Sequence, residues 1–307
     1  GGGARGVLEA VILRRLAEEF PDLLSHRIDL IAGTSTGGLL ALLLASGQSP
    51  AACVDVYKKW IPEVFAPRPY SLLNIESAKY GNEGKLKACE AHFGDSTLGD
   101  LKHYVVVPAF RLNAANRRKR AFSFFPGNHW RPALFSNLPA GASGVPPDNT
   151  MTSVDVAMST TAAPTFFPVW KGMVDGGVFA NNPSLLAVAR VFNTYPHIKR
   201  RNVKVLSLGA GHFDFNLDVD PHTNDWGLRA WWHSLVEMLL AGQSLSTDSS
   251  MAMLLRDNYK RFDITMERDI PLDAVEAIAE MEAMAMDADI EDLKGWVETH
   301  LAATPRT

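Results

Sequence analysis

The sequence contains only two cysteines among 307 residues, too few for a disulfide framework. Cys53 and Cys89 lie in no Cys-x-x-Cys or Cys/His spacing typical of a zinc site. We therefore expect reduced thiols, no bound metal and a cytoplasmic protein. No secretory signal or transit segment is recognisable at the start. Because residue 1 already opens a glycine-rich motif, we expect the natural chain to begin upstream of it.

Long hydrophobic runs and an excess of positive charge are also absent. The longest uninterrupted apolar run covers residues 39–45, far short of the roughly 18 residues needed to cross a bilayer. If the protein contacts a membrane, we therefore expect it to bind peripherally, at the membrane surface. The 30 Lys and Arg residues are outnumbered by 34 Asp and Glu, for a net charge of -4. No bulk positive field attracts nucleic acid, and we expect no nucleic-acid partner.

What the sequence does have is a globular composition, with 47% hydrophobic and 21% charged residues. These values exclude disordered, collagen-like and coiled-coil chains. The first half alternates helical periodicity with short apolar runs, which is the pattern of an α/β layer fold. From Trp226 onward helical patterns dominate. We predict one domain, with a sheet-based core over about 1–212 and a helical C-terminal part over about 226–301.

Hydrophobic periodicity and short apolar runs predict the order of the elements. Apolar residues recur at three- and four-residue steps from Val7 to Phe20, which predicts a helix directly behind the initial glycines. The predicted strands are 28–32, 104–110, 121–125, 169–174 and 203–208, of which the second and third can form a hairpin-like pair. The further predicted helices are 39–45, 229–241, 247–257 and 272–301.

Gly33-Thr34-Ser35-Thr36-Gly37 lies between a predicted strand and a predicted helix, the context of a nucleophile elbow. A serine at such a corner has a strained backbone, and Gly33 and Gly37 leave the space that side chains would fill. Ser35 is therefore a candidate nucleophile above the positive end of the following helix. The competing interpretation is a glycine-rich turn in which Ser35 only caps that helix.

Gly1-Gly2-Gly3-Ala4-Arg5-Gly6 is a flexible loop leading into a helix. Its backbone N–H groups can converge on the negative charge that forms during attack on a carbonyl. The rival interpretation is a dinucleotide-binding loop, because Gly1, Gly3 and Gly6 fit Gly-x-Gly-x-x-Gly. That alternative is weaker, since no βαβ unit with an acidic ribose ligand follows.

Asp175-Gly176-Gly177 follows the predicted strand at 169–174 and supplies a candidate base for Ser35. An acidic residue at a strand end, followed by two glycines, can approach another loop without side-chain obstruction. Taken alone, the same triplet is more typical of a turn. Asn182 and Pro183 then predict the N-cap and first position of a new helix.

Together, in this order, these motifs resemble the patatin-like phospholipases, lipid acyl hydrolases that use a Ser–Asp dyad. The loop at 1–6, the elbow at 33–37 and Asp175-Gly176 match three motifs of that family, and residues 161–167 and 206–211 are similar to further landmarks. The resemblance covers residue 1 to about residue 301. It implies an α/β fold in which a mainly parallel central sheet lies between helices, with one catalytic domain over residues 1–307.

The resemblance also implies the roles of individual residues. Ser35 would be the nucleophile and Asp175 the general base, and no cofactor or metal is implied. The substrate would be a phospholipid or another glycerolipid, reached at a membrane surface. The implied oxyanion hole comprises Gly1, Gly2, Gly3 and Ala4, and the motif-supporting residues are Arg5, Gly6, Gly33, Gly37, Gly176 and Gly177.

Other mechanisms and activities remain open. A carboxylate with a pKa near 4 is a poor base for serine in water, so a Ser–His–Asp triad is the competing arrangement. His197, His212, His222 and His233 are available, and no motif distinguishes them. The alternative activities are acyl transfer through the same acyl-enzyme and a lipid-binding or storage role with incidental esterase activity.

Two stretches are candidates for contact with lipid. Apolar residues at 60–73, interrupted by three prolines, suit either a lid or a loop packed over the core. The basic run at 117–120, beside three phenylalanines, suits either anionic headgroups or a solvated hairpin tip. Alternate acidic and amide residues at 214–220 depart from a calcium loop at Val219 and Asp225, so we expect no calcium there.

Overall fold

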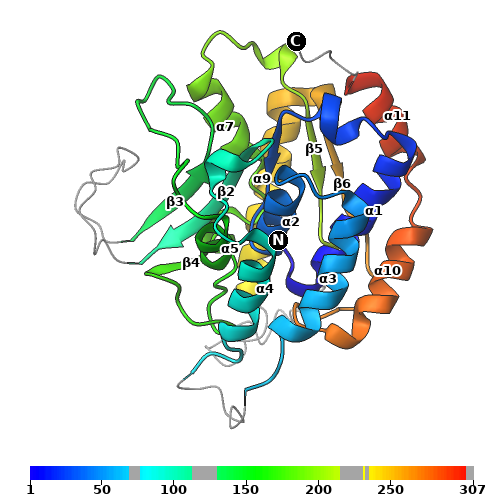
Figure 1. The fold of residues 1–307 in the computed structure, drawn as a ribbon. Helices are drawn as coiled ribbons and strands as arrows, with labels where there is room; N and C mark the ends of the chain where they lie inside the picture. Colours follow the sequence, from blue (N-terminus) through cyan, green and yellow to red (C-terminus); the bar gives the residue numbers. More distant parts are fainter. Residues whose placement is uncertain (69–76, 113–129, 215–230, 232–234, 302–307) are drawn as a thin grey trace, which may run out of the picture.

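The computed structural model describes residues 1–68, 77–112, 130–214, 231 and 235–301 (Figure 1). Helices and strands alternate along the first two thirds of the chain, which confirms the predicted α/β class. The α-helices are α1 (Gly6–Glu19), α2 (Thr36–Ala45), α3 (Pro50–Val64), α4 (Glu83–Phe93), α5 (Ser153–Thr160), α6 (Gly177–Ala180), α7 (Ser184–Thr194), α9 (Leu235–Leu255), α10 (Ile278–Asp287) and α11 (Glu291–His300). The short helical turns are η1 (Gly3–Arg5), η2 (Leu23–Arg27), η3 (Leu98–Asp100), η4 (Arg200–Asn202), η5 (Arg256–Asn258) and η6 (Val275–Ala277). The strands are β1 (Leu30–Ala32), β2 (Tyr104–Arg111), β3 (Arg131–Ser136), β4 (Met173–Asp175), β5 (Val205–Leu208) and β6 (Tyr259–Phe262).

Strand β2 is the hub of a four-stranded sheet. β1 runs parallel to β2, with Ala32 opposite Val106, and β3 runs antiparallel along the other edge. β4 also pairs antiparallel with β2, with Asp175 opposite Ala109. Because β3 already pairs with residues 109–111, β4 must share the edge that β1 occupies. The carboxyl ends of β1 and β4 therefore point toward each other along one edge of β2.

The pairings are more mixed than the predicted, mainly parallel sheet. β1–β2 and a second pair, β5–β6, are parallel, whereas β2–β3 and β2–β4 are antiparallel. The sheet contains these antiparallel pairs because β3 runs back along one edge of β2. β4 lies along the other edge and also runs against the direction of β2, from opposite Arg111 to opposite Ala109. The predicted strand at 121–125 lies outside the described residues. The strand predicted at 169–174 begins only at Met173, because Lys171 and Gly172 adopt positive φ angles and turn the chain.

After residue 234 the described chain forms α9, α10 and α11, together with one strand that the sequence did not predict. β6 lies parallel to β5, with Tyr259 opposite Val205. Its four residues include Lys260 and Arg261, so they form no apolar run. α9 continues through the break expected near residue 246, and α7 begins at Ser184, one residue later than predicted.

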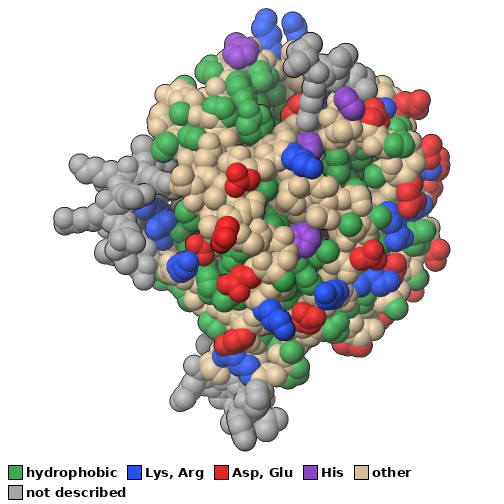
Figure 2. Space-filling view, in the orientation of Figure 1, with side chains coloured by type: hydrophobic (Ala, Val, Ile, Leu, Met, Phe, Trp, Pro, Cys, Tyr) green, Lys and Arg blue, Asp and Glu red, His purple; other side chains and the backbone are tan. Residues whose placement is uncertain are grey.

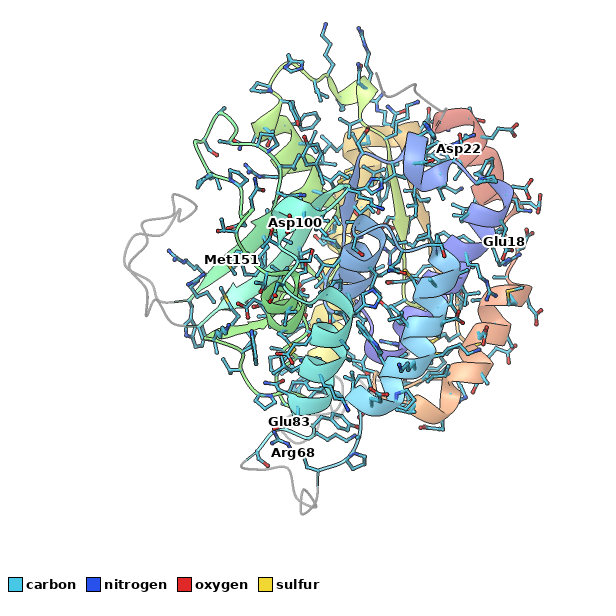
Figure 3. All side chains as sticks on the ribbon, viewed as in Figure 1. Glu18, Asp22, Arg68, Glu83, Asp100 and Met151 are labelled. Carbon is cyan, nitrogen blue, oxygen red and sulfur yellow. The ribbon has the colours of Figure 1, made fainter. Side chains whose placement is uncertain are left out.

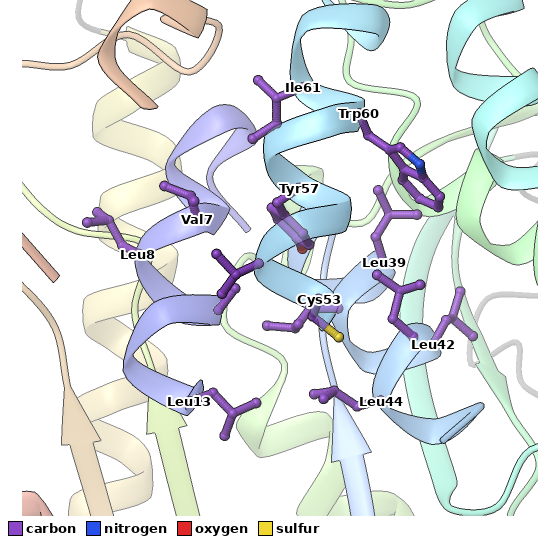
Figure 4. Close-up of a cluster of buried hydrophobic side chains, with 14 of the residues drawn as sticks. Val7, Leu8, Leu13, Leu39, Leu42, Leu44, Cys53, Tyr57, Trp60 and Ile61 are labelled. Atoms are coloured by element: carbon purple, nitrogen blue, oxygen red, sulfur yellow. The ribbon is translucent and has the colours of Figure 1, made fainter. Parts of the chain in front are cut away.

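Helix α2 is the centre of the hydrophobic core (Figure 4). It packs on β1 and β2 and is contacted by α1, α3 and α5. Leu39, Leu42, Leu43 and Leu44 are all buried. Burying a leucine side chain contributes about 1.5–3 kcal/mol, so α2 is firmly held. The residues at its N-terminus, including the candidate nucleophile, therefore sit on a rigid support.

None of the helices in the described ranges is long and apolar enough to span a bilayer. On the face shown in Figure 2, acidic and basic side chains are interspersed. This mixed distribution matches the small net charge of -4.

Candidate active site

Ser35 occupies the sharp turn between β1 and α2. Its backbone has φ 57° and ψ -127°, a conformation that non-glycine residues rarely adopt and that typically costs about 1–3 kcal/mol. The turn is closed tightly, since a Cβ at position 33 would lie 1.9 Å from the carbonyl oxygen of Gly37. The geometry is that of a nucleophile elbow, with a partly exposed Ser35 just before the first turn of α2.

The hydroxyl of Ser35 donates a hydrogen bond of 2.6 Å to Oδ2 of Asp175. The other carboxylate oxygen, Oδ1, accepts a 2.7 Å hydrogen bond from the N–H of Gly177. Asp175 is only 4% exposed. One oxygen thus faces the serine while the other is fixed by the backbone, which orients the carboxylate toward Ser35.

Burial raises the pKa of the Asp175 carboxyl above its usual value. The hydrogen bonds from Ser35 and Gly177 and the positive charge of Lys85 oppose that effect without cancelling it. A raised pKa makes the carboxylate a stronger base than it is in water. A buried carboxylate with a raised pKa is an environment in which an aspartate can accept a proton from a serine hydroxyl.

The sheet explains why these two residues meet. The chain leaves β1 at Ala32, and Gly33 N–H still bonds the carbonyl of Val106 at 3.2 Å. β4 arrives along the same edge of β2 and ends at Asp175, opposite Ala109. Only two residues of β2 separate the positions opposite the end of β1 and the end of β4. Asp175, at the end of β4, therefore faces the turn that follows β1.

Thr160, at the end of α5, also supports the pair, a role that the sequence did not predict. Its Oγ1 accepts a 3.0 Å hydrogen bond from Ser35 N–H and donates a 2.7 Å bond to the carbonyl of Pro108. Two residues later, the carbonyl of Ala162 accepts the N–H of Asp175 at 3.0 Å. The segment from Thr160 to Ala162 therefore contacts the backbone of both Ser35 and Asp175. In the sequence, the similarity of residues 161–167 to a landmark of the family was the signal that could have pointed to this segment.

Two further hydrogen bonds hold the elbow in place. Thr34 donates its hydroxyl to the carbonyl of Ala180 at 2.7 Å, which ties the turn to α6. The hydroxyl of Tyr57 on α3 donates to the carbonyl of Thr36. The elbow is thus attached to helices on both sides, and its strained conformation is stabilised by this surrounding structure.

The glycine loop lies directly against the elbow. A Cβ at Gly1 would lie 2.8 Å from Cβ of Ser35, and the N–H of Gly2 is 3.4 Å from Oγ1 of Thr36. Gly3 has φ 58°. Within the described ranges, the amide groups of Gly3 and Thr36 donate to no protein acceptor. These two amides are therefore free to donate to a ligand, and Thr36 directly follows Ser35 in the chain.

Ala4 differs from the expectation that it supplies an oxyanion donor. Its N–H donates to the carbonyl of Leu272 at 2.6 Å, so this amide is already engaged. The cause is the C-terminal part of the chain, which packs on the loop so closely that a Cβ at Gly3 would lie 2.1 Å from the same carbonyl. Arg5 is half-buried behind the loop, where burial lowers its pKa, and its role stays a prediction.

The described histidines do not complete a triad. His212 contacts the hydroxyl of Thr265 and lies 4.0 Å from Asp263, and His197 lies beside the ring of Tyr195. His222 and His233 lie outside the described residues. In the described part of the chain, the serine hydroxyl meets a carboxylate with no imidazole between them.

The described residues include only part of the candidate lid at 60–73. Trp60 and Ile61 belong to α3, with Pro62 accommodated in its last turn, so this stretch is helix and not irregular loop. Phe65 is buried against the rings of Tyr80 and Phe167. These side chains pack on the core. The rest of the candidate lid, from residue 69 onward, lies outside the described residues.

The other candidate sites give little further information. The basic run at 117–120 and most of the acidic stretch at 214–220 fall outside the described ranges. Across the described ranges, no group of His, Cys, Asp and Glu side chains is arranged to hold a metal ion. Cys53 and Cys89 are buried free thiols, and burial raises the pKa of each to about 12.

Comparison with known proteins adds independent information. The family model of the patatin-like phospholipases matches residues 1–188. A cGAMP-activated phospholipase of Pseudomonas aeruginosa is 29% identical over 270 residues, covering 86% of this chain and 76% of that protein. The cGAMP-activated phospholipase of Vibrio cholerae is 28% identical over 316 residues, covering 90% and 84% respectively. The solved structure of the type III effector protein ExoU covers 98% of this chain and 52% of that chain at 13% identity, with a TM-score of 0.37, too distant to inform the chemistry.

Proposed function

The chain belongs to the patatin-like phospholipase family, and on that premise we propose that it is a lipid acyl hydrolase with Ser35 as nucleophile and Asp175 as general base. The observation that supports these roles is the direct 2.6 Å hydrogen bond from Ser35 Oγ to the buried carboxylate of Asp175. The reaction class is cleavage of fatty acyl esters of glycerolipids, of the phospholipase A or lysophospholipase type.

In the first half-reaction, Ser35 Oγ attacks the acyl carbonyl carbon while its proton moves to Oδ2 of Asp175. The carbonyl oxygen becomes an oxyanion, for which the free amides of Gly3 and Thr36 are suitable donors. The N–H of Gly2 already donates to Oγ1 of Thr36. The tetrahedral intermediate then collapses. The ester C–O bond breaks, the protonated Asp175 returns the proton to the leaving alcohol oxygen, and an acyl-Ser35 ester remains.

In the second half-reaction, water takes the place of the departed alcohol. Asp175 accepts a proton from the water as its oxygen attacks the acyl-enzyme carbonyl. Collapse of the second intermediate breaks the bond to Ser35 Oγ, which regains the proton from Asp175, and a fatty acid is released. Losing one oxyanion donor typically costs about 2.7–4 kcal/mol of barrier stabilisation, so each free amide contributes substantially to the rate.

Acyl transfer shares the first half-reaction and differs only in the acceptor, and a storage role needs neither half-reaction. The test is mass spectrometry of the products from phospholipid, lysolipid and galactolipid, with Ser35→Ala as the control. Reaction with a fluorophosphonate probe separates an enzyme from a binding protein. Absence of both Ser35-dependent labelling and Ser35-dependent fatty acid release from folded protein contradicts the proposal.

The assay is run with and without cGAMP, because two relatives are named as cGAMP-activated phospholipases. Without that arm, an enzyme awaiting an activator would be mistaken for an inactive protein. Peripheral contact with a membrane is part of the proposal, since a glycerolipid substrate resides in a bilayer. Sedimentation of the protein with phospholipid vesicles measures that contact.

A further inference from the structure

Lys85 is a buried cation beside the candidate site that the mechanism above does not use. It lies on α4, two residues after the exposed Glu83 that begins the helix (Figure 3), yet it is only 2% exposed. Its Nζ donates a 2.9 Å hydrogen bond to the carbonyl of Thr161 and lies 3.9 Å from the centre of the Phe167 ring. Lysine is rarely buried completely without a paired charge.

The ammonium group of Lys85 is hydrogen-bonded to a neutral group and not to a carboxylate. Across the described ranges, Lys85 forms no salt bridge within 4.0 Å, and its hydrogen-bond acceptor is a neutral carbonyl. Among the described residues, the carboxylate whose charge acts on Lys85 is that of Asp175. Burying an ammonium ion without a close counter-ion costs several kcal/mol, so stability alone does not explain a lysine at this position.

The acceptor carbonyl has a central place in the site. Thr161 lies between Thr160, whose Oγ1 accepts the Ser35 N–H, and Ala162, whose carbonyl accepts the Asp175 N–H. A shift of Thr161 would therefore move both supports at once. A displacement of about 1 Å in reacting groups can lower a rate about a hundredfold.

We infer that Lys85 is a positioning residue for the Ser35–Asp175 pair: its ammonium group anchors the Thr160–Ala162 segment and adds a positive charge that acts on the Asp175 carboxylate. The inference rests on the proposed function, because it assigns Lys85 a part in the same reaction. It predicts that catalysis needs Lys85 in its protonated form.

The surroundings of Lys85 set the pH at which that form is lost. Burial lowers the pKa of its ammonium group to about 8, although the charge of Asp175 on β4 opposes the change. The other titratable group facing it is the thiol of Cys89 on α4, which stays neutral because burial raises its pKa to about 12. Thr161 and Phe167 present no titratable group. Activity should therefore fall as the pH rises through about 8.

The experiment compares Lys85→Met, Lys85→Arg and the wild-type chain on a water-soluble p-nitrophenyl ester, with kcat and KM measured from pH 5 to 10. Lys87→Met is the matched control, because Lys87 is exposed on the same helix. We expect Lys85→Met to lower kcat about 10- to 100-fold with little change in KM. In Lys85→Met, the acidic limb of the plot of kcat against pH should move to higher pH, because the Asp175 carboxylate loses a positive neighbour. The basic limb of the same plot, near pH 8, should disappear.

Lys85→Arg keeps the charge over the whole range, so it should retain more activity than Lys85→Met and move the basic limb well above pH 8. The inference is wrong if Lys85→Met keeps the wild-type kcat and both limbs. It is equally wrong if the limb near pH 8 is unmoved in Lys85→Arg, a comparison that remains valid even if Lys85→Met fails to fold.

Every rate is measured against Ser35→Ala. Equal rates for the wild-type chain and Ser35→Ala would contradict the proposed function itself. A Ser35-dependent rate that is unaffected in Lys85→Met would contradict only the role of Lys85. Circular dichroism and thermal unfolding of each variant separate lost positioning from lost fold.

Discussion

The hydroxyl oxygen of Ser35 lies 2.6 Å from Oδ2 of Asp175, although 140 residues separate them in the chain. The contact forms because β1 and β4 approach each other end to end along one edge of β2. Each residue is then held by a different neighbour, the amide of Gly177 for Asp175 and the hydroxyl of Thr160 for Ser35. Tests of this arrangement can therefore address each support separately.

Replacing Asp175 by Asn keeps the shape of the side chain and removes the base. We expect kcat to fall about 10²- to 10⁴-fold, the usual contribution of general base catalysis. Steady-state hydrolysis of a p-nitrophenyl ester measures the loss, and circular dichroism verifies the fold. Near-normal kcat in this variant would point to another base and revive the histidines outside the described residues.

Asp175→Asn should also stabilise the fold at neutral pH. Burial raises the pKa of Asp175 in the folded state, so the folded protein binds more protons than the unfolded chain just above pH 4. Stability from this group is present at low pH and is lost as the pH rises through the raised pKa. Thermal unfolding should give a higher Tm for the variant at pH 7 and a smaller difference near pH 4. The same difference in Tm at pH 4 and at pH 7 would contradict a raised pKa of Asp175.

Lys85→Met should show the complementary pH dependence of stability. The pKa of Lys85 is about 8 in the folded protein and about 10.4 when unfolded, so between these values the unfolded chain binds more protons. Wild-type stability therefore rises with pH across that window. The variant should be more stable by up to about 3 kcal/mol at pH 7, with a gap that narrows toward pH 10. Urea unfolding at pH 7, 8.5 and 10 measures the difference in free energy of unfolding between the variant and the wild-type chain. A difference that grows with pH would contradict a lowered pKa of Lys85.

Thr160→Val should lower activity through the elbow and not through the base. The substitution leaves Ser35 N–H and the carbonyl of Pro108 without their partner, which costs about 1–3 kcal/mol for each buried group. We expect kcat to fall about tenfold or more, because the elbow loses a support. Ser159→Ala is the matched control, since the hydroxyl of Ser159 donates within its own helix, to the carbonyl of Asp155. Equal kcat values for the two variants would show that Thr160 does not position Ser35.

Gly33→Ala should prevent formation of the elbow. The added Cβ would lie 1.9 Å from the carbonyl oxygen of Gly37, far inside the van der Waals distance of two non-bonded atoms, so the turn must open. We expect loss of fluorophosphonate labelling and a lower Tm. Gly242→Ala is the control, because a Cβ on that exposed helical residue meets no atom within 4 Å and should add up to about 1 kcal/mol of helix stability. Full labelling of Gly33→Ala would contradict the tight turn.

Local patterns in the sequence were sufficient for several elements. Hydrophobic patterns predict the helix after the glycine loop, the strand and helix on either side of Ser35 and the strand at 104–110, and the structure contains each of them. By contrast, β3 and β6 were not predicted, because short strands that contain charged residues or prolines resemble loops. The break expected within α9 was also wrong, since its Ser and Thr residues continue the helix.

The sequence by itself determined the family and the identity of the candidate nucleophile and base, because glycines and polar residues at fixed spacing form recognisable motifs. Only the tertiary structure decided which residues surround them. The ammonium group of Lys85 and the carbonyl of Leu272 come from segments without a motif of their own. Their positions depend on which strand ends and helices meet in space, and contacts between distant segments leave no periodic signal in a single sequence.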